Sequence, residues 1–150
     1  MLEKTKVLLN YFKGEGYTFE QLLELRDDLE YYGEEDYAEG IEIEGMELII
    51  LTDEEADQRT REEVENGLGF FIPEWLSYYI KLEVDEIKKI QSLYGASNPI
   101  LKALIDDFDQ FYNDTIAEEA EGRGHFLSYY DGIETEVSTD EEDFYIYRIN

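Results

Sequence analysis

Hydrophobic residues follow a helical period over most of the chain and an alternating period in two places. The helical spacing predicts helices over residues 2–12, 18–33, 52–66, 73–80, 84–94 and 98–111, with residues 115–121 as a continuation of the last. Capping boxes at Thr18–Gln21 and Thr52–Glu55 indicate two of the helix starts. Pro73 and Pro99 fit the first turn of two others, because an N–H is not needed there.

The alternating period predicts strands in the middle and at the end of the chain. These strands cover residues 41–44, 46–51, 125–130, 133–137 and 144–149, and a loop over residues 34–36 precedes the first. Around Gly45 the pattern fits either two strands or one long strand bent at the glycine. Asp131-Gly132 predicts a hairpin with a type I′ turn. In the last strand Phe144, Ile146 and Arg148 share one face, and Tyr145, Tyr147 and Ile149 share the other.

These elements predict an α+β fold, with several helices packed on a small antiparallel sheet formed by the middle and C-terminal strands. The chain has 150 residues, the usual size of one domain, and no linker or repeat divides it. We expect a single domain over residues 1–150, with a helical N-terminal part (1–40) and an α+β core (41–150). Hydrophobic residues make up 43% and aromatic residues 15%, which is too apolar for a disordered acidic tail.

Acidic residues far outnumber basic ones. Thirty-nine Asp and Glu stand against twelve Lys and Arg, so the formal net charge is −27. A small domain needs a net charge of only about 2–8 for solubility, and self-repulsion destabilises the compact state. Such a field disfavours nucleic acid and anionic membranes as partners, and it favours a cationic one. The charge therefore points to a basic protein surface.

The acid is also segregated along the chain. No Lys or Arg occurs from Asp27 to Asp57, and from Ala103 to Asn150 only Arg123 and Arg148 do. The acids that follow Thr52 are partly explained by a helix N-terminus, which favours negative charge. The acidic runs at residues 106–109, 118–121 and 140–143 have no such local explanation in the sequence. Halophilic adaptation is a rival explanation, but it predicts evenly spread acid and a leaner apolar content.

We expect the acidic tracts to contact the partner. The candidate residues are Asp27, Asp28, Glu34, Glu35, Asp36, Asp53, Glu54, Asp57, Asp106, Asp107, Asp109, Asp114, Glu118, Glu119, Glu121, Asp140, Glu141, Glu142 and Asp143. Carboxylates on one helix face stand roughly 5–6 Å apart, and those on one strand face roughly 6.5–7 Å apart. Phosphates of DNA repeat about every 3.4 Å along the axis, and further apart through space. Rows of carboxylates can therefore imitate a phosphate backbone.

The sequence offers little material for catalysis. It contains no cysteine and one histidine, His125, so the usual zinc sites and a thiol nucleophile are excluded. Ser128 lies three residues from His125, which puts the two side chains on opposite faces of a strand. No phosphate-binding glycine motif is present. We therefore expect a non-enzymatic protein with no catalytic residues, no metal site and no cofactor. No signal peptide or membrane span is visible, which favours a cytoplasmic location.

Three segments carry a resemblance to known proteins. Leu51-Thr-Asp-Glu-Glu-Ala-Asp57, Gly122-Arg-Gly-His125 with Tyr130-Asp-Gly132, and Phe144-Tyr-Ile-Tyr-Arg-Ile-Asn150 resemble small acidic proteins encoded by bacteriophages and mobile elements. In addition, Asp107-Phe-Asp-Gln-Phe-Tyr-Asn-Asp114 resembles part of the ArdA-type antirestriction proteins, which are DNA mimics, although Asn113 replaces their arginine. The resemblance implies a place in the cytoplasm of a bacterial host and a restriction or CRISPR effector as the partner.

The leading hypothesis is an acidic inhibitor of the anti-CRISPR or antirestriction type, which binds a basic groove as a nucleic-acid mimic. One alternative is an interaction or regulatory module that uses a tyrosine-rich surface. Its candidate residues are Tyr31, Tyr32, Tyr78, Tyr79, Tyr129 and Tyr130. A second alternative is a small Mg²⁺-dependent hydrolase built on carboxylates. The sequence leaves the partner and the oligomeric state open.

Overall fold

Two compact units make up the chain, as a computed structural model that describes residues 1–120 and 122–150 shows. Unit 1 comprises Met1–Asp57 and Arg123–Asn150, and unit 2 comprises Gln58–Gly122. The expected boundary between a helical N-terminal part and an α+β core, at residue 40, therefore lies inside unit 1. Whether the chain folds as one domain is a question of cooperativity, and the expectation of a single domain stays a prediction.

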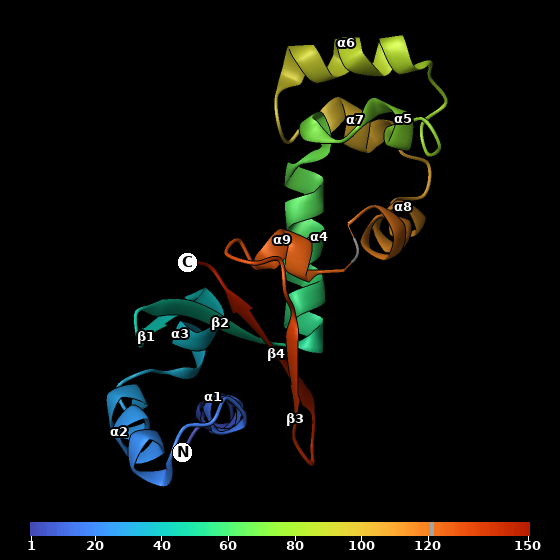
Figure 1. The fold of residues 1–150 in the computed structure, drawn as a ribbon. Coiled ribbons are helices and arrows are strands. Elements are labelled where there is room, and N and C mark those ends of the chain that lie inside the picture. The colour runs from blue at the N-terminus through green and yellow to red at the C-terminus, as the bar shows by residue number, and fades with distance from the viewer. Residues whose placement is uncertain (121) are drawn as a thin grey trace. The chain divides into compact units, whose positions relative to one another are not determined.

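Unit 1 contains the four-stranded sheet and the helices that pack on it (Figure 1). Its elements are α1 (Glu3–Gly14), α2 (Phe19–Leu29), α3 (Glu34–Glu39), β1 (Ile41–Ile43), β2 (Met46–Thr52), the start of α4 (Asp53–Asn66), α9 (Gly124–Leu127), β3 (Thr135–Ser138) and β4 (Asp143–Arg148). The strands lie in the order β1-β2-β4-β3, and every neighbouring pair is antiparallel. The predicted α+β fold, with a sheet of middle and C-terminal strands, is confirmed.

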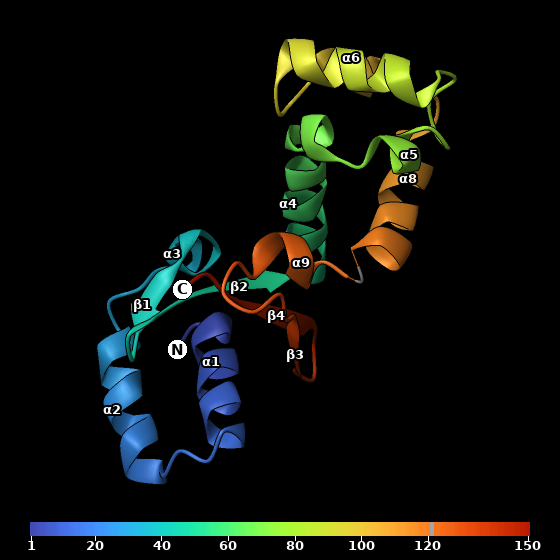
Figure 2. The same ribbon diagram turned by 45° about the horizontal axis from the view of Figure 1, so that its top comes forward.

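Both faces of the sheet are covered. On one face Ile50, Phe144 and Ile146 join a core that α1 and α2 complete with Val7, Leu8, Phe12, Leu25 and Leu29. On the other face Ile49, Leu51 and Tyr147 pack with Ala56 of α4 and Leu127 of α9. Figures 1 and 2 show α1 and α2 on one side of the strands and α9 on the other. The predicted alternation of the last strand is confirmed, because its even and odd residues enter different cores.

Unit 2 is helical. It holds the rest of α4, η1 (Leu68–Phe70), α5 (Pro73–Leu76), α6 (Val84–Tyr94), α7 (Pro99–Leu104), α8 (Phe108–Asp114) and the π-helical turn η2 (Thr115–Glu119). Its buried side chains include Val64, Leu68, Leu76, Ile87 and Phe111. Gly69 approaches the loop after α6 so closely that a Cβ there would lie 2.0 Å from the carbonyl oxygen of Gly95. Only glycine fits at that position.

The predicted helix starts are confirmed. The Thr18 hydroxyl accepts from the Gln21 N–H at 3.3 Å, and the Gln21 side chain accepts from the Thr18 N–H at 2.8 Å. Thr52 and Glu55 bond reciprocally in the same way, at 3.2 and 3.1 Å. Pro73 and Pro99 are the first residues of α5 and α7. These local signals set the helix starts because they satisfy backbone donors that the helix leaves without partners.

Several predicted helix boundaries are wrong. The helices predicted to run to residues 33 and 80 end at Leu29 and Leu76. Residues 34–36 begin α3 rather than form a loop, because the Asp36 carboxylate accepts from the Gly33 N–H at 2.6 Å and three acids occupy the favourable first turn. The helix predicted over residues 98–111 ends at Leu104. The Asp107 carboxylate accepts from the Gln110 N–H at 3.1 Å and starts a new helix, α8. Asp36 and Asp107 accept hydrogen bonds at the starts of α3 and α8, whereas the sequence pattern predicts surface charge at both positions.

The hairpin predicted over residues 125–137 is also wrong. Residues 124–127 form α9. Ser128 then holds the following turn, because its hydroxyl donates to Ile133 O at 2.5 Å and its backbone carbonyl accepts from the Gly132 N–H at 2.8 Å. The real hairpins are β1–β2 and β3–β4. In the first of these, Glu44 and Gly45 both have positive φ, which is the conformation of a type I′ turn. Gly45 therefore separates two strands.

Candidate functional site

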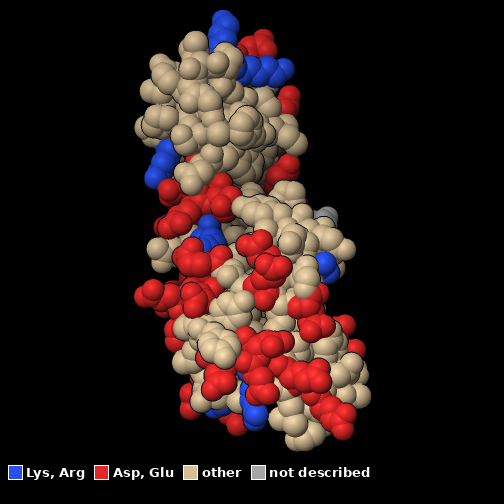
Figure 3. Space-filling view, turned by 90° about the vertical axis from the view of Figure 1, so that its left-hand side faces the viewer, with Lys and Arg blue, Asp and Glu red and all other residues tan. Residues whose placement is uncertain are grey.

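The acidic charge is unequally divided between the two units. Unit 1 holds 25 of the 39 acidic residues and 6 of the 12 basic ones, a formal net charge of −19, against −8 for unit 2. Several of the basic residues in unit 1 are engaged by its own carboxylates, in the pairs Lys4–Glu55, Lys6–Glu3 and Arg26–Asp27. Asp and Glu side chains far outnumber Lys and Arg on the face of unit 1 that Figure 3 displays. We therefore take the acidic surface of unit 1 as the candidate site.

A hollow of about 490 Å³ lies in this surface, and we call it the acidic hollow. Its lining residues are Glu3, Lys4, Glu34, Glu35, Ala38, Glu39, Thr52, Glu55, Glu142 and Phe144. The register of the sheet assembles it, because Thr52 at the end of β2 pairs with Phe144 at the start of β4. Glu55 and Glu142, 87 positions apart in the chain, thereby line the same hollow. Tyr37, buried in the core, holds α3 and its acids beside them.

Lys4 is the one basic residue that lines the acidic hollow in the part of the chain that the structure describes. It is 4% exposed, and its ammonium lies 3.1 Å from the nearer carboxylate oxygen of Glu55. Burial alone would raise the pKa of Glu55, but hydrogen bonds from Thr52 and Lys4 and the charge of Lys4 outweigh it and hold that pKa below its usual value. The positive charge of Lys4 is therefore balanced by Glu55 within the protein, and the other carboxylates leave the rim of the hollow negative.

The β3–β4 turn extends the acidic surface. Thr139 accepts from the Glu142 N–H at 3.1 Å and donates to Glu142 O at 2.8 Å, which fixes the turn through the backbone. The side chains of Asp140 and Glu141 are exposed and line a second hollow, of about 370 Å³, together with Glu3 and Lys6. Glu3 thus belongs to both hollows.

The predicted contact residues are only partly brought together. The acidic hollow unites Glu34, Glu35 and Glu142, and the second hollow adds Asp140 and Glu141. Asp27, Asp28, Asp36, Asp53, Glu54, Asp57 and Asp143 also belong to unit 1 and are exposed. Asp106, Asp107, Asp109, Asp114, Glu118 and Glu119 belong to unit 2, and Glu121 lies outside the described residues. Glu3, Glu39 and Glu55 were not predicted, because no sequence signal places residues from the first helix beside the last hairpin.

Two acids of the run at α8 have structural roles that the sequence did not indicate, and their contact with a partner stays a prediction. Asp107 caps the helix, as described above, and Asp109 pairs with Arg61. The guanidinium of Arg61 in turn lies over the rings of Phe108 and Tyr112, at 5.3 and 5.1 Å from their centroids. This part of the predicted surface is tied into the packing of unit 2.

The candidate tyrosines do not belong to one unit. Tyr31, Tyr32, Tyr129 and Tyr130 lie in unit 1, and Tyr78 and Tyr79 lie in unit 2. Tyr31 is 90% exposed, whereas Tyr32 donates its hydroxyl to Glu42 O at 3.0 Å. Arg148 lies 3.8 Å above the ring of Tyr130. The tyrosines are therefore in different local environments.

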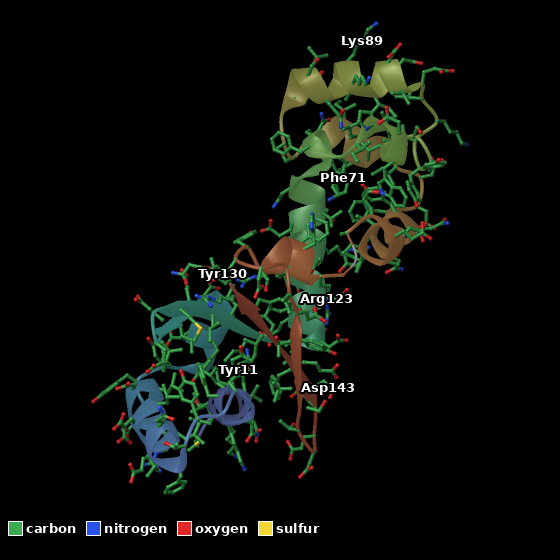
Figure 4. All side chains as sticks on the ribbon, in the orientation of Figure 1. Tyr11, Phe71, Lys89, Arg123, Tyr130 and Asp143 are labelled. Carbon is green, nitrogen blue, oxygen red and sulfur yellow. The ribbon has the colours of Figure 1, made fainter. Side chains whose placement is uncertain are left out.

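The segments that carry the phage-protein resemblance meet around Arg123 (Figure 4). The guanidinium donates to both carboxylate oxygens of Glu134, at 2.9 and 3.2 Å, and to the backbone and side chain of Asp53, at 3.1 and 3.0 Å. It also lies 4.5 Å above the ring of Tyr145. A Cβ on Gly124 would lie 2.4 Å from the Gly132 carbonyl oxygen. Residues of all three segments thus stabilise unit 1 from within.

The same cluster includes Tyr147, which is fully buried and donates its hydroxyl to Glu134 at 2.5 Å. Burial first, and then this bond to a carboxylate, raise the pKa of the Tyr147 hydroxyl, so it stays a protonated donor. His125, in contrast, is exposed, and its ring lies edge-on to Phe126. The predicted strand environment for His125 is wrong, because His125 lies within the helix α9.

Among the described residues, no group of three or more His, Cys, Asp or Glu side chains has the geometry to hold a metal ion. No helix within residues 1–120 and 122–150 has the length and apolar character needed to span a bilayer. No protein-family model matches this chain, and neither a curated protein nor a solved structure does.

Proposed function

We propose that this protein is a non-enzymatic inhibitor that imitates nucleic acid and presents the acidic surface of unit 1 to a basic groove of a host defence enzyme of the restriction or CRISPR type. The observation that carries the proposal is the net charge of unit 1, −19, together with the eight acidic residues that line the two hollows. None of the ion pairs within the described part of the chain uses Glu34, Glu35 or Glu142. A folded protein retains such mutually repelling charge at a cost in stability.

The difference between the units supports this function over halophilic adaptation. Adaptation to salt acts on the whole surface, whereas unit 1 carries a far greater excess of acid than unit 2. A groove built for phosphates offers Lys and Arg, which pair with carboxylates as readily by charge. The long-range field of unit 1 also speeds encounter with such a groove and repels DNA and RNA.

Capture from a bacterial lysate at low salt, repeated at high salt, tests the proposal. The full chain serves as bait, the retained protein is identified by mass spectrometry, and the purified partner is titrated with double-stranded DNA and with RNA in competition. We expect release at high salt and displacement by one of the two nucleic acids. Retention that is equal at low and high salt, or a partner that binds nucleic acid and the chain together, would overturn the proposal.

Two matched variants locate the contact. Glu34→Gln/Glu35→Gln/Glu142→Gln removes three charges from the acidic hollow, and Glu62→Gln/Glu74→Gln/Glu119→Gln removes three exposed charges from unit 2. Salt screens the attraction between the carboxylates and a basic groove, so fewer charges in the contact make Kd less dependent on salt. We expect weaker binding and a shallower salt dependence of Kd for the first variant, and little change in either for the second. Equal effects would show that only net charge matters.

The tyrosine surface of unit 1 is the second candidate, and the 90% exposure of Tyr31 favours it. Tyr31→Ala together with Tyr129→Ala removes two exposed rings without changing charge. Lost capture in this variant, with capture kept in the triple glutamine variant of the hollow, would assign the contact to the tyrosines.

A further inference from the structure

Unit 2 contains a hollow of about 390 Å³ in which three aromatic rings face carboxylates. Its lining residues are Trp75, Tyr78, Tyr79, Gln110, Asp114 and Glu118. The aromatic residues are three and four positions apart in α5 and the turns that follow it, and the polar residues are four positions apart along α8 and η2. These spacings place each set on one face of its helical segment. One wall of the hollow is therefore aromatic and the other is acidic.

The rings stand at an angle to one another, as the walls of a cage do. The ring centroid of Trp75 lies 6.1 Å from that of Tyr78 and 5.5 Å from that of Tyr79, with interplanar angles of 69° and 58°. The indole N–H of Trp75 donates to the Thr115 hydroxyl at 3.0 Å, and the ring of Tyr79 packs edge-on against Phe111. Two of the three rings are thus held in place before any ligand arrives.

The carboxylates keep capacity to accept hydrogen bonds. Asp114 accepts the Tyr79 hydroxyl on one oxygen, at 2.7 Å, and a carboxylate has about four lone-pair sites in all. Burial, then this hydrogen bond and the charges of Asp114 and Glu118, raise the pKa of Tyr79, so its hydroxyl stays a neutral donor. Glu118 is exposed at the rim. The hollow therefore combines ring faces with negative charge.

A local irregularity of the helix brings Glu118 to this position. Residues 115–119 form a π-helical turn, in which the Ala120 N–H donates to Thr115 O at 2.8 Å. Such turns are rare and occur often at functional sites, because they shift side chains around the helix axis. The same turn supplies Thr115, which orients Trp75. One irregular turn thus contributes to both walls of the hollow.

We propose that this hollow binds the guanidinium group of an arginine side chain presented by a protein partner. A guanidinium is planar, so it stacks flat on an aromatic ring and donates two parallel hydrogen bonds to one carboxylate, whereas an ammonium has neither the plane nor the fork. The acidic charge of the whole chain favours such a group on a basic protein over free arginine, which carries a carboxylate of its own. This site lies in unit 2 and does not rest on the function proposed for unit 1.

Trp75 provides a direct readout, because it is the chain's single tryptophan and lines the hollow. Its fluorescence, excited where tyrosine absorbs little, is followed while the full chain is titrated at low salt. The probes are a blocked Gly-Arg-Gly peptide, the same peptide with citrulline in place of arginine, and free arginine. We expect a saturable change with the arginine peptide, weaker binding of free arginine and no saturation with the neutral citrulline peptide. Equal responses to arginine and citrulline would overturn the proposal, and tighter binding of free arginine would overturn the protein source.

Two variants separate the site from bulk charge. Glu118→Gln removes a carboxylate of the hollow, and Glu119→Gln removes the neighbouring carboxylate, which is also exposed but does not line the hollow. We expect the first to weaken binding of the arginine peptide about three-fold and the second to leave it unchanged. Tyr78→Ala weakens it about two- to five-fold through the lost ring face. If the two glutamine variants weaken binding equally, the hollow is not the site.

Discussion

In unit 1 the turn between β3 and β4 presents Asp140 and Glu141 to solvent, whereas in unit 2 the acidic run before and within α8 is bonded locally. The two runs look alike in the sequence. Their roles differ because α8 needs a cap at Asp107 and has Arg61 within reach of Asp109, whereas the hairpin turn is fixed through Thr139. An acidic run therefore indicates a partner only through those of its residues that have no structural role within the protein.

Two basic residues of unit 1 differ from the lysines on α6 of unit 2, although Arg61 and Lys102 of unit 2 are also paired with carboxylates. In unit 1, Lys4 and Arg123 lie inward and join distant segments, to Glu55 and to Asp53 and Glu134. In unit 2, Lys88 and Lys89 are exposed on α6, and Figure 4 shows Lys89 pointing away from the fold. Lys4 and Arg123 thus serve the stability of unit 1, whereas Lys6 and Arg26 form exposed pairs. The surface of unit 1 is left strongly negative.

The largest effect should come from Arg123. Arg123→Ala leaves Glu134 and the Tyr147 hydroxyl without their cation, in a site where the Arg123 side chain is only 12% exposed. Removing one partner of such a pair costs about 3–5 kcal/mol of unfolding free energy. Urea unfolding followed by far-UV circular dichroism measures the loss.

Arg26→Ala is the control for this variant. Arg26 pairs with Asp27 at 3.3 Å on an exposed surface, so its removal should cost less than about 0.5 kcal/mol. A loss at Arg123 no larger than the loss at Arg26 would contradict the role given to the Arg123 cluster.

The next effect should come from the cap of α8. Asp107→Ala removes the acceptor of the Gln110 N–H and should cost about 1 kcal/mol. Asp107→Asn removes the same charge but keeps a capping oxygen, so we expect it to be nearly neutral. Thermal and urea unfolding of both variants measures the two changes in stability. Equal stability of the alanine and asparagine variants would show that Asp107 acts through charge and not through the cap.

Neutralising the acids of the β3–β4 turn should raise the free energy of unfolding, by less than Arg123→Ala or Asp107→Ala lowers it. Asp140→Asn with Glu141→Gln relieves repulsion among exposed carboxylates, and we expect a gain of about 0.5 kcal/mol at low salt. The gain should shrink at high salt, because exposed charges are screened within about 10 Å at 0.1 M ionic strength. A loss of stability would mean that these acids have a structural role, as those of α8 do.

Sequence patterns predict this fold where the signal is local. Capping boxes at Thr18 and Thr52 and the prolines of α5 and α7 are read within four residues, and each was confirmed. The hairpin over residues 125–137 was wrong because its cause is tertiary. Gly124 packs against Gly132, and Arg123 reaches Asp53, 70 positions away. Alternation alone cannot exclude the short helix that results.

The candidate site could be predicted in its chemistry but not in its shape. Acidic tracts pointed to Glu34, Glu35 and Glu142, and the structure places them in one hollow. Glu3 and Glu55 were missed because their place depends on the pairing of Thr52 with Phe144. The hollow of unit 2 was missed for a similar reason, since it depends on the π-helical turn after α8.

The smallest effect that we expect concerns the unfolding midpoints measured by two probes, which should not differ. This comparison decides whether the two units are parts of one domain or separate domains. Trp75 reports on unit 2 alone, because unit 1 has no tryptophan, and far-UV circular dichroism reports on both units. α4 supplies Ala56 to the core of unit 1 and the buried Val64 to unit 2, so melting either unit removes support from the other. We therefore expect the midpoints from the two probes to coincide, both in the natural chain and in Arg123→Ala. If the Trp75 midpoint stayed fixed while the dichroism midpoint of Arg123→Ala fell, the units would be separate domains, and the acidic surface of unit 1 could then be tested without unit 2.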